Sequence, residues 1–182
     1  KKKIQQKSIL NQLPSGEGIK KAPGYDKFIR NNPEYNESEF IDKVRKAFID
    51  IQDAWQKKDI SGVRKFIYDG VYQRFNTQFR MMDLLGQTNT IDDLEVKNIY
   101  IDRVDTDGLY DIIHVAIHAS ITDRFISTLE PSLNSGGTEE FGEYWSFLKK
   151  RGKPGKDIYY TDNCPNCGSP LPGDMGEVSW CA

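Results

Sequence analysis

The sequence is short of the residues that would point directly to a chemical reaction. Its 182 residues include only two histidines and three cysteines. An odd number of cysteines argues against a disulfide framework, which uses cysteines in pairs. The sequence has no run of roughly 18 apolar residues that could span a membrane, and no segment resembles a signal peptide. The length and the composition, with 37% hydrophobic residues, suit one folded domain of ordinary size and a small appendage.

The formal net charge of −2 hides an uneven distribution of charge. Residues 1–30 carry eight Lys or Arg against Glu17 and Asp26, a net +6, so the rest of the chain carries −8. We therefore expect residues 1–31 to be a basic arm or linker, which either contacts anionic lipid or is simply solvated. Because nucleic-acid binding depends on basic charge, we do not expect it from the acidic remainder.

Three helices are predicted before any strong strand signal. Asn36 followed by Glu39 forms a capping box, which favours a long helix from this point. Asp59 is a suitable cap for a second, shorter helix, and a third is expected from about residue 69 to residue 85, ended by Gly86. In the long helix, apolar residues recur at spacings of three and four, which places them on one face: Phe40, Val44, Ala47, Phe48, Ile51, Ala54 and Trp55.

The chain then changes to the alternation of strands. Residues 94–103 and 109–121 are predicted as two strands, joined by a turn at Asp107 and Gly108. The odd positions of the second strand are apolar apart from Asp111, which indicates one buried face.

A further strand is predicted after a loop. Residues 130–138 are rich in Pro, Ser, Asn and Gly and read as a loop, and residues 141–148 form an aromatic strand. The order of elements predicts an α+β fold, in which N-terminal helices wrap a curved antiparallel sheet.

A sheet covered by helices can enclose an apolar pocket. We expect its lining to come from both layers: Phe48, Ile51, Trp55, Phe75, Phe79, Ile113, Val115, Ile117, Trp145 and Phe147. Asp111 is the one acid expected at the rim of such a pocket; the alternative is that it lies in water at the start of its strand. His114 and His118 share the opposite face about 13 Å apart, too far to bind one metal, which favours a structural role.

The strongest single motif is Cys164-Pro165-Asn166-Cys167-Gly168. Two thiolates at this spacing can bind one tetrahedral ion, and Cys181 is placed to supply a third. The fourth ligand is expected near position 184, beyond this chain. We predict a structural zinc ribbon, of which residues 157–182 form part, in preference to a redox dithiol.

Several motifs between residues 32 and 150 occur in a recognisable order: Asn32-Pro33-Glu34, a helix from Phe40, Ile51-Gln52-Asp53-Ala54-Trp55, Asp59, Arg64, Tyr72, Phe75, Leu85-Gly86, Asn89 and Glu143-Tyr144-Trp145-Ser146-Phe147. This combination resembles the Tim44-like family, named for the C-terminal domain of the mitochondrial import-motor tethering subunit, and particularly its bacterial members. The resemblance implies a cone of the nuclear transport factor two type over residues 32–150, with an apolar cavity and no enzymatic activity. Some bacterial members carry a similar zinc ribbon. Residues 1–24 match no chaperone-binding region, so a role in motor recruitment is not implied.

The resemblance further implies action at the inner membrane, by contact with anionic lipid or with a membrane protein. We expect the cytoplasmic face, with an anchor outside this sequence, because the chain begins at Lys1 without a methionine. The preferred function is a non-catalytic tethering domain with a pocket for a lipid or other hydrophobic ligand. The alternative is an isomerase or dehydratase that uses the cone cavity, supported by fold analogy alone. Formation of a homo-oligomer stays open.

Overall fold

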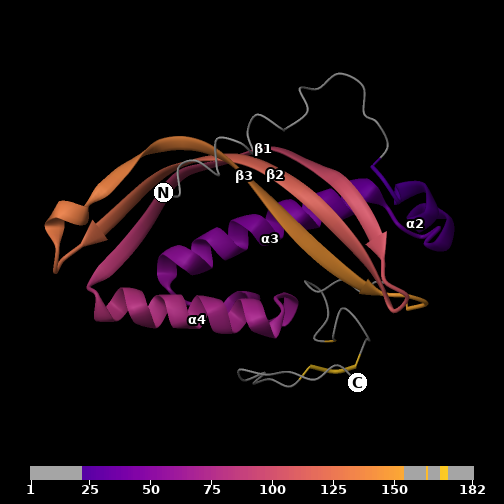
Figure 1. Cartoon of the computed structure of the whole chain (residues 1–182), viewed down its shortest axis with the longest axis horizontal. Coiled ribbons are helices and arrows are strands. Elements are labelled where there is room, and N and C mark those ends of the chain that lie inside the picture. Colours follow the sequence, from indigo (N-terminus) through magenta and orange to yellow (C-terminus); the bar gives the residue numbers. More distant parts are fainter. Residues whose placement is uncertain (1–21, 154–162, 164–168, 172–182) are drawn as a thin grey trace. The chain divides into compact units, whose positions relative to one another are not determined.

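The computed structural model describes residues 22–153, 163 and 169–171. Its elements are α2 (Tyr25–Asn31), α3 (Glu37–Lys57), the 3-10 helix η1 (Ser61–Phe66), α4 (Asp69–Leu84), β1 (Gln87–Thr106), β2 (Tyr110–Ser127), the 3-10 helix η2 (Pro131–Leu133) and β3 (Ser135–Lys150). The strands form a sheet in the order β1-β2-β3 (Figure 1). The N-terminal helices pack on this antiparallel sheet, which confirms the predicted α+β class.

The chain divides into two compact units, and the long elements run through both. Unit 1 comprises the chain up to Arg45 with Asp93–Ile121 and Thr138–Arg151. Unit 2 comprises Lys46–Asp92, Thr122–Gly137 and the chain from Gly152. The contacts that follow all lie within one unit or the other.

The helices α3 and α4 begin and end close to where the local sequence predicts, whereas α2 lies within the segment expected to be an arm or linker. The Asn36 Oδ1 atom accepts the Glu39 backbone N–H at 3.2 Å, so this part of the expected capping box is confirmed at the start of α3. The Asp59 carboxylate accepts the Ser61 backbone N–H at 2.9 Å, but the helix that follows, η1, is of the 3-10 type. Gly86 follows α4 with φ of 58°, a conformation that favours glycine after a helix.

The strands are longer than the sequence predicts, and the loop predicted at residues 130–138 is wrong in its second half. Only η2 and its flanks fall outside strands there, because β3 already begins at Ser135. Gly136 explains the error: a Cβ at this position would lie 2.7 Å from the carbonyl oxygen of Asp123. Glycine is therefore used here for close approach of two backbones and not for a flexible turn.

The core of unit 1 is built on the apolar row of β2. Ile113, Val115, Ile117 and Ala119 are at most 3% exposed, as the alternation predicts. In the part of the chain that the structure describes, no helix is long and apolar enough to cross a membrane.

Candidate functional site

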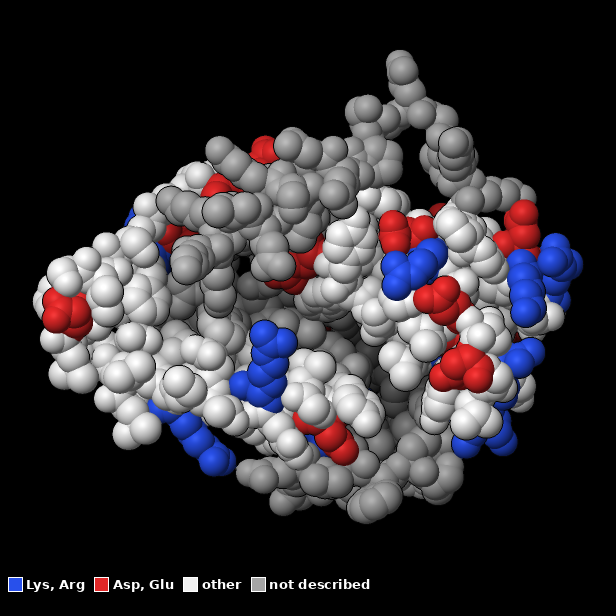
Figure 2. Space-filling model, viewed as in Figure 1, with Lys and Arg blue, Asp and Glu red and all other residues white. Residues whose placement is uncertain are grey.

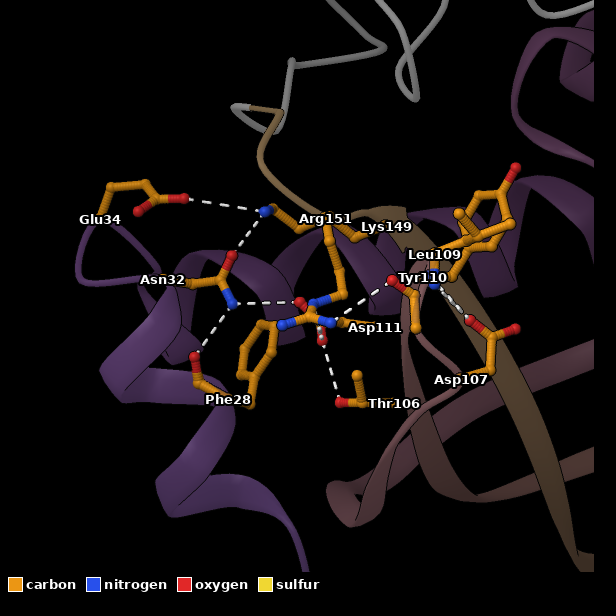
Figure 3. A network of polar contacts seen from close by, with 11 residues as sticks. Phe28, Asn32, Glu34, Thr106, Asp107, Leu109, Tyr110, Asp111, Lys149 and Arg151 are labelled. Atoms are coloured by element: carbon orange, nitrogen blue, oxygen red, sulfur yellow. Dashed lines mark hydrogen bonds and ion pairs between the residues drawn. The ribbon is translucent and has the colours of Figure 1, made fainter.

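Asp111 lies at the centre of a buried polar cluster in unit 1 (Figure 3). Asn32, which directly follows α2, donates from Nδ2 to Asp111 Oδ2 at 3.2 Å, and the Thr106 hydroxyl donates to Oδ1 at 3.0 Å. The guanidinium of Arg151 comes within 4.0 Å of the same carboxylate. Asp111 is only 1% exposed, so it is neither in water nor at the rim of an open pocket. Its hydrogen bonds link α2, β1 and β2.

The cluster extends to β3 through Lys149. The Lys149 ammonium donates to Asn32 Oδ1 and lies 3.9 Å from the Glu34 carboxylate. Asn32 is 3% exposed and also donates to the carbonyl oxygen of Phe28 at 2.9 Å. Buried polar groups are costly unless they are hydrogen-bonded. Because these partners satisfy Asp111 and Asn32 so fully, we interpret the cluster as a structural clamp.

A different acid lies on the apolar side of β3. Glu143 shares the odd-numbered row of this strand with Trp145 and Phe147, and the Trp145 Nε1–H donates to Glu143 Oε2 at 2.8 Å. Burial raises the pKa of Glu143 above its ordinary value, and the hydrogen bond from Trp145 opposes that rise only in part. Among the described residues this carboxyl group forms no ion pair.

Aromatic rings extend this row into the N-terminal helices. Phe147 lies 5.4 Å from Phe40 in an edge-to-face arrangement, and Phe40 lies 5.7 Å from Tyr35. Trp145 and Phe147 have centroids 6.3 Å apart, and both side chains are only half-buried. The Tyr35 hydroxyl is buried without a hydrogen-bond partner among the described residues, and burial raises the pKa of Tyr35. These residues form the aromatic row of unit 1.

The opposite face of the sheet is polar and tied together across three strands. His114 on β2 contacts the Ser146 hydroxyl on β3 through Nδ1 at 2.8 Å and Asp105 on β1 through Nε2 at 3.0 Å. Serine, histidine and aspartate at such distances also occur in hydrolases. Here they join three neighbouring strands. The hydrogen bond from Arg103, followed by the contact with His114, lowers the pKa of Asp105.

A second histidine takes part in a similar contact. His118 Nε2 lies 3.3 Å from Glu140 Oε2, and Lys97 on β1 donates to the same carboxylate. The Lys97 contact is the larger cause of the lowered pKa of Glu140. Both histidines therefore face away from the apolar row, and we interpret their role as structural, as the sequence favoured.

Unit 2 carries a separate aromatic group and an exposed apolar surface. Trp55 lies 5.6 Å from Phe75 and 5.5 Å from Phe79, and its indole N–H donates to Asn89 at 2.9 Å. Gly86, which directly precedes β1, accepts hydrogen bonds at its carbonyl oxygen from both the backbone N–H and the hydroxyl of Thr128. The segment after α4 and the segment after β2 are therefore side by side.

Four leucines project from these two segments, and we call them the leucine tip: Leu84, Leu85, Leu129 and Leu133, which are 79, 47, 70 and 52% exposed. Single exposed leucines are common, whereas a group of them marks a contact surface. On the face shown in Figure 2, basic and acidic side chains of the described residues are interspersed, with no broad area of one sign.

The structure separates the predicted pocket residues into two kinds. Six are buried: Phe48, Ile51, Phe79, Ile113, Val115 and Ile117. Trp55, Phe75, Trp145 and Phe147 are half-buried. The predicted metal ligands Cys164, Cys167 and Cys181 lie outside the described residues.

Sequence reasoning did not predict the contacts of Glu143 and Asn32, or the leucine tip. For Glu143 a signal existed, because its odd number places it on the same side of the strand as Trp145 and Phe147. No local pattern could predict the contacts of Asn32, because its partners Asp111 and Lys149 lie 79 and 117 residues further along the chain. The leucine tip depends on two distant segments meeting, which no local pattern predicts.

Comparison with known proteins agrees with the resemblance noted in the sequence. The model of the Tim44-like domain family matches residues 21–160. No curated protein matches the sequence. Among solved structures, the crystal structure of the intermembrane space region of chloroplast protein ARC6 matches with a TM-score of 0.43 and 11% identity, over 64% of this chain and 94% of that chain.

Proposed function

Because this chain belongs to the Tim44-like domain family, whose members are generally non-catalytic binding or tethering domains, we propose that it is a tethering domain that contacts an anionic membrane surface. The observation that carries the proposal is the leucine tip, where four leucines are exposed on two segments that the hydrogen bonds between Thr128 and Gly86 hold side by side. Apolar side chains and basic charge together are what a surface-bound protein uses on anionic lipid. The net +6 of residues 1–30 supplies that charge.

Four further features belong to the same proposal: the shape of the fold, a hydrophobic ligand, a zinc ion and the place of action. The fold closes as a cone of the nuclear transport factor two type, and apolar side chains of unit 1 bind a hydrophobic ligand. Cys164 and Cys167 hold a structural zinc ion with Cys181, and the isolated bridge between Asn163 and Pro170 supports this because these two residues flank the first two cysteines in the sequence. The place of action is the cytoplasmic face of the inner membrane.

Flotation with liposomes tests membrane contact. The full chain is mixed, at low salt, with vesicles of phosphatidylcholine alone or with added phosphatidylglycerol. We expect flotation with the anionic vesicles, which weakens as salt rises because the attraction is screened. A form that begins at Ala22 should lose the preference for anionic lipid. This boundary keeps Pro23, whose carbonyl oxygen accepts the Val104 N–H at 2.8 Å.

The leucine tip is tested with a matched pair of variants. Leu129→Ser should reduce flotation of the chain with either vesicle, because it removes a side chain that is 70% exposed at the tip. Leu109→Ser is the control, since Leu109 is 69% exposed but lies in unit 1 at the turn between β1 and β2. If neither the full chain nor the shortened form floats at low salt, direct membrane contact is wrong. Equal loss with both variants would remove the specific role of the tip.

A further inference from the structure

The carboxyl group of Glu143 sits in surroundings that do not suit a negative charge. Its strand neighbours on the same side are Phe141, 6% exposed, and Trp145, half-buried. The alternate residues Tyr144 and Leu148 are 46 and 57% exposed. Glu143 therefore points to the apolar side of β3. A carboxylate that is partly withdrawn from water, with no cationic partner among the described residues, is destabilised relative to its protonated form.

The one hydrogen bond that Glu143 accepts within the described part of the chain does not require an acid. The Trp145 Nε1–H could be accepted equally well by the amide oxygen of a glutamine, without the cost of burying a carboxylate. The raised pKa of Glu143 agrees with this cost. The negative charge is therefore useful only when a positive group comes to it.

The neighbouring rings supply the other half of a cation site. Trp145 and Phe147 are half-buried, so part of each ring is accessible, and Phe40 packs against Phe147 at 5.4 Å. The faces of aromatic rings attract cations within about 6 Å, with tryptophan the strongest. Rings combined with a carboxylate suit an organic ammonium group, which keeps apolar methyl or methylene groups against the rings.

We propose that Glu143, Trp145 and Phe147 bind the ammonium group of an amphiphilic organic cation, whose apolar part lies along the aromatic row of unit 1. The inference rests on the ligand-binding part of the proposed function and names the charge of the ligand. The same chemistry occurs in a free alkylammonium ion and in the choline head of a lipid. It does not involve the leucine tip or residues 1–30.

Calorimetric titration of the full chain with three probes of equal chain length tests the proposal. The probes are hexyltrimethylammonium, hexanol and hexyl sulfate. We expect the cation to bind at least tenfold more tightly than hexanol, and hexyl sulfate to bind most weakly. Dihexanoylphosphatidylcholine, used below its micelle concentration, distinguishes a lipid head from a free amine: tighter binding than that of hexyltrimethylammonium indicates the lipid source.

Two variants and one control locate the effect. Glu143→Gln keeps an acceptor for Trp145 and should bring the affinities for the cation and hexanol within twofold of each other. Glu139→Gln, at an exposed position of β3, should leave the tenfold preference unchanged. Trp145→Phe removes the indole and should weaken cation binding while the thermal midpoint verifies the fold.

The outcomes are separable from those of the broader proposal. Equal affinity of the wild-type chain for the cation and hexanol overturns the cation site but leaves a hydrophobic ligand site. If neither the cation nor hexanol binds, both the cation site and the hydrophobic ligand site are wrong. The wild-type comparison decides this even if a variant fails to fold, and a preference that survives Glu143→Gln would exclude Glu143 as its source.

Discussion

At the scale of single residues, two acids on the apolar side of the sheet have opposite surroundings. Asp111 is surrounded by donors from Asn32 and Thr106, with Arg151 nearby. Among the residues that the structure describes, Glu143 has one donor, Trp145. The sequence singled out Asp111 correctly as an unusual charge in an apolar row. It could not identify the partners, because Asn32 precedes it by 79 residues.

The clamp around Asp111 should contribute strongly to stability. Asp111→Ala would leave Asn32 and Thr106 without an acceptor in a buried site, and we expect a loss of about 3 kcal/mol in the free energy of unfolding. Urea unfolding measures it, with Glu139→Ala at an exposed site as the control. A loss no larger than that of the control would mean that the cluster is not a clamp.

Glu143 should make stability depend on pH in the opposite sense from a paired acid. Since burial raises its pKa in the folded chain, the folded state holds a proton that the unfolded chain has already released. Its contribution is therefore greatest at pH values below the ordinary pKa of glutamate and is lost as pH rises through the raised value. Glu143→Gln should be more stable than the wild type at pH 7, with the difference shrinking towards pH 4. Thermal midpoints across this range measure it, and a difference independent of pH would contradict the assignment.

At the scale of elements, β1 is an edge strand that is protected by side chains and by the chain before α2. In unit 1, Arg45 donates to the Val96 carbonyl oxygen at 2.9 Å and Val104 donates to Pro23. In unit 2, the Ile91 N–H donates to Gln56 at 2.9 Å. Such contacts occupy backbone groups that would otherwise pair with another chain.

Local patterns predicted the kinds of elements well and their lengths poorly. Nearby residues determine where α3 begins and α4 ends, as Asn36 with Glu39 and Gly86 do, so the sequence could predict these two helices. The ends of β1 and β2 extend beyond the alternating stretches because pairing with a neighbour overrides composition. Asp93, for example, belongs to β1 although its φ of 51° lies outside the range of a regular strand.

Gly24 controls the contact between the N-terminal segment and β1. Its φ is 79°, and a Cβ there would lie 1.9 Å from the Val104 carbonyl oxygen. Gly24→Ala should displace Pro23, accelerate hydrogen exchange of the Val104 amide at least tenfold and lower stability by about 1–2 kcal/mol. Gly137→Ala is the control, because a Cβ at Gly137 meets nothing within 4 Å. Unchanged exchange at Val104 would show that the segment tolerates the change.

At the scale of the whole molecule, family membership and charge distribution supply the functional framework. The ordered motifs predicted the family, which the match over residues 21–160 shows. Neither the ligand nor the partner follows from those motifs, since they mostly specify core packing, for example at Phe75. The zinc ribbon likewise stays a prediction, because its cysteines lie outside the described residues.

Metal analysis of the purified chain tests the ribbon. We expect zinc in the protein, in a ratio of up to about one per chain, because three thiolates can hold the ion with a fourth ligand from solvent. Cys164→Ser with Cys167→Ser should abolish it, whereas substitution of an exposed serine in β3, Ser146→Ala, should not. Zinc retained in the double cysteine variant would place the metal elsewhere.

The clamp around Asp111 also affects the order in which the protein can fold during its synthesis. Asn32 contacts Lys149, which is 117 residues further along the chain. At a synthesis rate of about 5–20 residues per second, the helix α2 waits roughly 6 to 23 seconds for this partner to be made. During translation α2 thus emerges well before β3 and can complete its contacts only after β3 has been made, which leaves α2 accessible to other molecules until then.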